Sequence, residues 1–197
     1  MGYHRAGFEV VGVDINPQPN YPFEFHQADA LYFPLNGFDV IHASPPCQAH
    51  SSLTSLTSTK THVDLIPETR RRIQGYPYVI ENVPHSPLIN PIILCGTNFG
   101  LAVARHRLFE SNLLIVGHNG CNHNSRQLYT VLTKSCRKIG DMRGKSSHSI
   151  GKRAMGIDWM TQFEMGLAIP PAYTEHIGNQ IKRHITNASS RPKGRAA

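Results

Sequence analysis

Residues 38 to 48 read FDVIHASPPCQ, and this stretch determines how the rest of the chain is interpreted. Phe38 to Ala43 is a short apolar run, which predicts a buried strand. Ser44-Pro45-Pro46 ends the run, because proline cannot donate to a strand ladder and fixes the backbone of a turn. Cys47 therefore follows a stiff turn directly beyond the carboxyl end of a strand.

Two other apolar runs have the same form. Phe8 to Ile15 ends in an acidic residue before Asn16-Pro17, and Tyr76 to Val83 ends at Pro84. Val63 to Gln74 has a helical pattern with Gly75 as its stop, which supplies a crossover between strands. Together these segments predict an open α/β sheet with its chemistry at the carboxyl edge.

The other segments complete a single domain. Met155 to Leu167 and Ile177 to Ile185 predict helices, whereas Ser51 to Thr61 predicts a mobile loop after Cys47. Gly117 to Ser149 predicts an irregular insertion with one apolar patch at Leu128 to Leu132. We expect a core over residues 1–116, a short insertion over 117–150, the rest of the core over 151–185 and a basic tail over 186–197.

Composition narrows the class of protein. The 197 residues carry a formal net charge of +7, which favours a polyanionic partner such as nucleic acid. The apolar runs are far shorter than the roughly 20 residues that span a bilayer, so we expect no membrane segment. The start of the chain lacks the pattern of a secretory signal, which predicts a cytoplasmic protein, and we expect a monomer. In that compartment the four cysteines are thiols or ligands.

Three segments carry the chemistry. A lone cysteine is most often an inert buried thiol, but Cys47 stands at a sheet edge where a cation could favour its thiolate. Glu81 also follows an apolar strand, and a desolvated carboxyl group there could donate a proton to a ring nitrogen. Arg105 and Arg107 are one residue apart on a predicted strand, so we expect both to face the same side.

These segments resemble the cytosine-5 DNA methyltransferases. The match consists of Pro46-Cys47, Glu81-Asn82-Val83 and the Arg105-x-Arg107 element, in the family's order. Gly7 to Ile15 is similar to the family's second strand, and Ile177 to Gln180 is similar to its closing Gly-Asn helix start. The resemblance covers most of residues 2–116 and 151–185, and points to the short bacterial or phage forms, so it implies the cytoplasm of a bacterium or of a phage-infected cell.

The resemblance implies a reaction and its residues. It implies a Rossmann-like fold that transfers a methyl group from S-adenosylmethionine to C5 of cytosine in DNA. Cys47 would attack cytosine C6, Glu81 would protonate N3, and Arg107 with Arg105 would support the base or Glu81. The implied cofactor-binding residues are Asp14, Ile15, Asp29, Ala30, Pro45 and Asn179. Asp14 would bind the ribose hydroxyls, Asp29 would contact the adenine amino group, and Asn179 would close the pocket.

The chain departs from the family in two places. The family begins with a central strand and a Gly-rich turn, yet Met1 to Arg5 resembles the helix after that turn. We therefore expect the first strand to be missing, which would leave unpaired edges on both neighbouring strands. The second departure is the insertion between Arg107 and Met155, which is shorter than the family's usual recognition domain.

The insertion also contains histidines and cysteines. His118, Cys121, His123 and Cys136 are a candidate metal set, but Cys121-Asn122-His123 is tighter than the usual spacing of paired zinc ligands. We expect no metal site and interpret these residues as incidental. Cys95 lies in an apolar segment, which predicts burial.

Two other functions stay open. Without the Gly-rich turn, the chain could be an inactive relic that binds DNA, although a pure binder needs neither Cys47 nor Glu81. The small insertion also leaves RNA or a free nucleotide open as the substrate.

Overall fold

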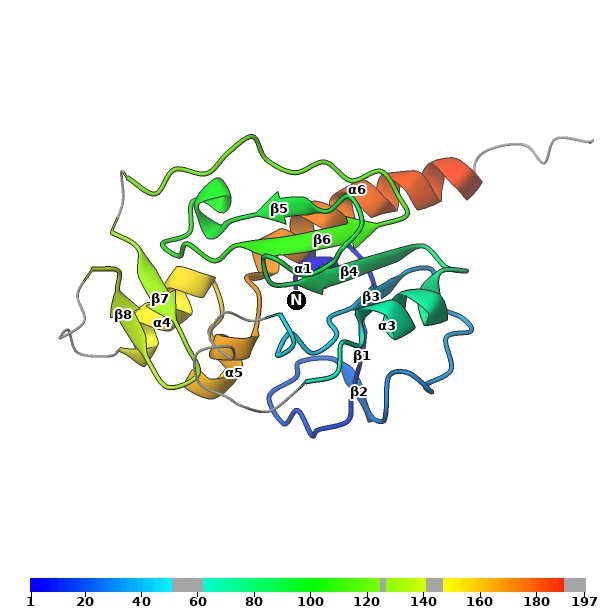
Figure 1. Cartoon of the computed structure of the whole chain (residues 1–197), viewed down its shortest axis with the longest axis horizontal. Helices are drawn as coiled ribbons and strands as arrows, with labels where there is room; N and C mark the ends of the chain where they lie inside the picture. Colours follow the sequence, from blue (N-terminus) through cyan, green and yellow to red (C-terminus); the bar gives the residue numbers. More distant parts are fainter. Residues whose placement is uncertain (51–61, 125–126, 141–146, 190–197) are drawn as a thin grey trace, which may run out of the picture.

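The computed structural model describes residues 1–50, 62–124, 127–140 and 147–189. They form a mixed α/β protein in which a four-stranded sheet has the order β3-β4-β6-β5 (Figure 1). The bounds of its strands are β3 (Ile41–Ala43), β4 (Tyr78–Asn82), β5 (Ile92–Leu94) and β6 (Arg107–Ser111). β3 and β4 are parallel, whereas β6 runs antiparallel to both β4 and β5. The predicted α/β class is confirmed, and so are the strands expected near residues 38–43 and 76–83.

The chain begins with a short helix, α1 (Gly2–Arg5), and a separate pair of strands. β1 (Val11–Asp14) and β2 (Glu24–Gln27) are parallel and form a sheet of their own. Among the described residues, β1 pairs with no strand but β2, and β3 with none but β4. Each of these two strands therefore keeps one edge unpaired.

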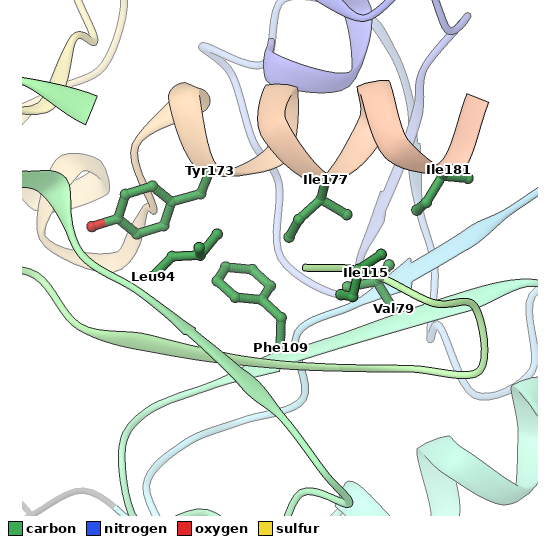
Figure 2. Close-up of a cluster of buried hydrophobic side chains, with 7 residues drawn as sticks. All are labelled: Val79, Leu94, Phe109, Ile115, Tyr173, Ile177 and Ile181. Carbon is green, nitrogen blue, oxygen red and sulfur yellow. The ribbon is translucent and has the colours of Figure 1, made fainter. Parts of the chain in front are cut away.

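Both faces of β4 are covered, which explains why all five of its residues are buried. Val79 faces α6 (Pro171–Ser189), where it packs with Phe109, Ile177 and other apolar side chains (Figure 2). Ile80 points to the opposite face and packs with Ile73 of α3 (Ile66–Ile73). The predicted helix over Val63 to Gln74 is confirmed in this shorter form.

The second half of the chain adds a smaller unit with its own core. It contains the hairpin β7 (Tyr129–Val131) and β8 (Cys136–Lys138), and the helices α4 (His148–Met155) and α5 (Gln162–Leu167). Its apolar side chains form a cluster separate from the one beneath α6. The expected boundary at residue 150 falls inside α4. A short 3-10 turn, η1 (Gly96–Phe99), follows β5 in the main unit.

Two predicted helices are wrong in their bounds. The helix expected over Met155 to Leu167 is interrupted, because Gly156 ends α4 with a positive φ of 66° and Thr161 caps the start of α5. The helix expected from Ile177 begins earlier, at Pro171, where proline is well tolerated because the first turn needs no amide donor. The loop predicted over Ser51 to Thr61 lies outside the described residues.

In the described ranges, no helix has the length and apolar character needed to cross a membrane.

Candidate active site

The carboxyl ends of β3 and β4 lie side by side and carry the predicted nucleophile and acid. Ala43 pairs with Ile80, so the parallel register brings Ser44 beside Glu81 and Pro45 beside Asn82. The Asn82 side-chain amide donates a hydrogen bond of 3.0 Å to the Pro45 carbonyl oxygen. The turn before Cys47 is therefore tied to the strand end that carries Glu81.

Asn82 is almost completely buried, and its side-chain oxygen also makes hydrogen bonds. It accepts hydrogen bonds from the Val83 amide at 2.9 Å and from the Ser86 hydroxyl at 2.8 Å. With donor and acceptor both satisfied, this side chain has one orientation available to it. Asn82 is a positioning residue that the family resemblance identified only as part of a motif.

Cys47 is a free, half-buried cysteine two residues beyond Pro45. Its carbonyl oxygen accepts a hydrogen bond of 3.0 Å from the His50 amide, which closes a turn around it. The thiol lies near enough to Arg105 for the two groups to interact electrostatically.

Glu81 is buried, with only 8% of its surface exposed. Its carboxylate oxygen Oε1 lies 3.0 Å from Nε of Arg107. Burial raises the pKa of Glu81 above its ordinary value, and the Arg107 charge and a hydrogen bond from Ser44 oppose this only in part. The group is thus better able to hold a proton near neutral pH than an exposed glutamate.

The two arginines do not share a strand, contrary to the prediction. β6 begins at Arg107, and Arg105 lies ahead of it, where its guanidinium donates to the carbonyl oxygens of Val131 at 3.1 Å and Gly166 at 2.7 Å. These bonds turn the two side chains to different partners, so only Arg107 pairs with Glu81. Burial lowers the pKa of Arg105 to about 10, which still leaves it charged at neutral pH. Its Nε is buried and has no partner among the described residues.

Four of the predicted cofactor-binding residues gather at the carboxyl ends of β1 and β2. The Asp14 carbonyl accepts from the Ala28 amide at 3.0 Å, and Gln27 donates to the Ile15 carbonyl at 3.1 Å. The Asp14 carboxylate accepts from the Asn16 amide at 2.8 Å through one oxygen. Asp29 accepts in the same way from the Leu31 amide at 2.9 Å and precedes Ala30. Both aspartates keep a second carboxylate oxygen with no hydrogen bond to a described residue.

The other two cofactor candidates lie elsewhere. Pro45 is buried beside Asn82 at the end of β3. Asn179 is exposed in the middle of α6, so the expected Gly-Asn helix start is wrong. Gly178 has a packing reason instead, because a Cβ on it would lie 2.9 Å from the Cβ of Ala6, the residue that follows α1.

The structure does not bring the four residues of the candidate metal set together. Cys136 is buried in the core of the smaller unit. The His118 ring packs edge to face against Phe99 and lies against His176. Cys121 and His123 instead meet Cys95 and His106. Sequence spacing could not reveal the last two, because they come together only through the pairing of β5 with β6.

A comparison of the chain with models of known protein families and with curated proteins finds no match to either.

Proposed function

We propose that the protein is a DNA (cytosine-5) methyltransferase that uses S-adenosylmethionine. The observation that carries this proposal is the hydrogen bond between Asn82 and Pro45, which joins the Cys47 turn to the end of β4 beside a buried Glu81. A nucleophile, an acid and two cations then border one sheet edge. This set suits attack on an electron-poor ring whose nitrogen takes up a proton.

Each residue has a role in the reaction. The Cys47 thiolate forms a bond to cytosine C6, and the electrons of the C5–C6 double bond move through the ring toward N3. Glu81 donates its proton to N3 and accepts from the exocyclic amine, so C5 becomes nucleophilic. After C5 is methylated, a base such as water takes up the C5 proton, the C6–S bond breaks to regenerate the thiolate, and N3 returns its proton to Glu81. Glu81 is ionised during this cycle, and Arg107 stabilises its charge.

S-Adenosylmethionine supplies the methyl group. The residues at the ends of β1 and β2 fit its polar parts, because Asp14 and Asp29 each keep a free carboxylate oxygen that can accept from a ribose hydroxyl or an adenine amine. The unpaired edges of β1 and β3 also support the proposal, since the family resemblance implies a further central strand with these two as neighbours.

DNA is the proposed substrate because the chain is basic and the target base must leave the duplex to reach Cys47. The smaller unit, with its hairpin β7–β8, is the proposed recognition unit. A monomer in the cytoplasm of a bacterium or a phage-infected cell is the corresponding setting.

The test uses a duplex that contains 5-fluorocytosine, because fluorine at C5 blocks the elimination that frees the cysteine. The wild-type protein with S-adenosylmethionine should form a denaturation-resistant adduct, and the Cys47→Ser variant should form none. Adduct formation by the serine variant would exclude Cys47 as the nucleophile. Methyl transfer to duplex DNA, RNA and dCMP, measured in parallel, distinguishes the substrates. A chain that binds DNA but neither binds the cofactor nor forms an adduct would be a relic.

A further inference from the structure

Four side chains outside the proposed active site form a compact cluster of possible metal ligands. The ligand atoms of Cys95, His106, Cys121 and His123 all lie within 4.8 Å of one another. The Cys95 sulfur is 3.3 Å from Nε2 of His123, and Nε2 of His106 is 3.3 Å from the Cys121 sulfur. The rings of His106 and His123 meet edge to face, with their centroids 5.0 Å apart.

The β-sheet brings the first two of these residues together. Leu94 at the end of β5 pairs with Arg107 at the start of β6, so Cys95 and His106 occupy the next cross-strand position. Residues at such a position have Cβ atoms about 5 Å apart, which suits two ligands of one ion. Cys95 is buried, and Thr97 donates a hydrogen bond of 3.3 Å to its sulfur. One half of the cluster is thus built on rigid elements.

The other half comes from the segment after β6. Asn98 of η1 donates a hydrogen bond to the Gly120 carbonyl, which ties this segment to the turn that follows β5. Cys121 and His123 follow at once, and both are exposed. No strand or helix contains residues 112–124, so local pairing does not explain why two ligand types point at Cys95 and His106.

We propose that Cys95, His106, Cys121 and His123 bind a zinc ion. Two thiolates and two imidazoles are a ligand set that zinc prefers in tetrahedral sites. Zinc bonds of about 2.3 Å to sulfur and about 2.0 Å to nitrogen place neighbouring ligand atoms roughly 3.3 to 3.8 Å apart. The two sulfur–nitrogen distances of 3.3 Å match that spacing. Binding displaces the thiol protons, so each neutral cysteine releases one proton as its sulfur bonds to the ion.

The site is structural rather than catalytic, because four protein ligands leave no open position for water or substrate. Its place in the chain gives it a consequence for the proposed reaction. His106 immediately precedes Arg107, which pairs with Glu81. A zinc ion on His106 would fix the start of β6 and thereby the position of Arg107. This proposal departs from the expectation that the histidines and cysteines are incidental.

The test measures metal directly in the full 197-residue chain, purified under reducing conditions. Elemental analysis should find about one equivalent of zinc per chain. Wild-type protein stripped by a chelator and titrated with cobalt(II) should show the intense visible bands of a tetrahedral site and a thiolate-to-cobalt charge-transfer band, saturating at one equivalent.

The variants Cys121→Ser and His123→Asn should each bind zinc at least tenfold more weakly, the scale expected when a ligand is lost. Two controls should keep the full metal content. His118→Asn removes a histidine whose ring packs edge to face against Phe99. Cys47→Ser removes a thiol outside the cluster. Loss of zinc in His118→Asn would assign the ion to other ligands and overturn the proposal.

Cobalt binding to the stripped wild-type chain decides the matter if a variant fails to fold. Absence of zinc together with absence of a tetrahedral cobalt spectrum overturns the proposal, and so does a Cys95–Cys121 disulfide found by mass spectrometry in the reduced preparation. None of these readouts depends on methyl transfer, so the zinc site and the proposed function can fail separately.

Discussion

The side-chain amide of Asn82 donates a 3.0 Å hydrogen bond to the carbonyl oxygen of Pro45. This bond joins the ends of two parallel strands that come from distant parts of the sequence. It ties the turn that leads to Cys47 to the end of the strand that carries Glu81. In the proposed reaction, Asn82 would thus help to position the segments that carry the nucleophile and the acid.

Asn82→Asp should slow covalent adduct formation while the protein stays folded. The substitution keeps the shape of the side chain but removes the donor to Pro45, and places a carboxylate against a carbonyl oxygen. A loss of about 2 kcal/mol, roughly 30-fold in rate, is expected for a hydrogen bond of this kind. The rate of adduct formation with 5-fluorocytosine duplex measures it.

Asn112→Asp is the matched control for this variant. The Asn112 amide donates to the Tyr76 carbonyl at 2.8 Å, at the opposite end of β4. The Asn112→Asp variant should have a lower melting temperature than the wild type, but the same rate of adduct formation. Equal rates for the wild type and Asn82→Asp would show that the bond does not position Cys47.

The pH dependence of methyl transfer should have an alkaline limb that belongs to Glu81. Burial raises the pKa of this carboxyl group, so its protonated fraction persists to higher pH than in an ordinary glutamate and is lost as pH rises further. Glu81→Gln cannot donate an acidic proton, so kcat/KM should fall by about 100-fold or more and its alkaline limb should flatten. Profiles of kcat/KM against pH for the two proteins test this.

Glu68→Gln provides the control for the pH profile. Glu68 lies on the exposed side of α3 and pairs with Arg71, away from the Cys47 turn. The profile of this variant should coincide with that of the wild type. An alkaline limb that survives unchanged in Glu81→Gln would remove Glu81 from the role of proton donor.

Asp14→Ala should weaken binding of S-adenosylmethionine. The substitution removes the carboxylate oxygen that is free at the end of β1, which should cost about 1.5 to 3 kcal/mol in binding free energy. Isothermal titration with the cofactor measures the change. Asp39→Ala, outside this edge, is the control. Unaltered affinity in a folded Asp14→Ala protein would place the ribose elsewhere.

Arg70→Met should destabilise the fold much more than Arg71→Met. Arg70 makes two bonds of 2.7 Å to the carboxylate of Glu110, which is almost fully buried, whereas the Arg71 pair with Glu68 is exposed. Breaking a buried pair costs about 3 kcal/mol or more, which lowers the melting temperature by roughly 6 to 12 °C at this chain length. The exposed pair should contribute little to stability, because water and salt screen it.

The same pair predicts how stability depends on acid. Burial alone would raise the pKa of Glu110, but bonds from Arg70, the Ile89 amide and Tyr78 together lower it below the ordinary 4.5. The ionised Glu110 therefore contributes its full stabilisation above the ordinary pKa of 4.5. This contribution is lost as the pH falls through the lowered pKa of the folded state. Melting temperatures of wild type and Arg70→Met should converge in this acidic range. A constant difference would assign the loss to packing instead.

The sequence was most informative where local signals determine structure. The strands at Ile41–Ala43 and Tyr78–Asn82 follow from apolar runs that end at prolines, and these endings already placed Cys47 and Glu81 at one edge. Parallel pairing of β3 with β4 then brings Ser44 and Pro45 beside Glu81 and Asn82, whereas the approach of Cys47 itself to Glu81 stays a prediction.

Where the structure depends on pairing between distant segments, the sequence was less informative. The partners of Arg105 come from β7 and α5, so its direction could not follow from strand alternation. The cluster of Cys95 and His106 depends on the register between β5 and β6. Gly178 was interpreted as part of a cofactor motif, but its small size also serves the close approach of α1, which no local pattern reveals.

Arg105 has a consequence for how the molecule unfolds. Its carbonyl accepts from Tyr173 of the core beneath α6, while its guanidinium holds the carbonyls of Val131 and Gly166 in the smaller unit. One residue thus joins two hydrophobic cores through hydrogen bonds that water replaces only if the units separate. The amides of β7 and α5 should therefore exchange with the same opening free energy as those of β6, because the two units open as one cooperative unit. Arg105→Lys, which cannot span both carbonyls, should let the smaller unit exchange by itself.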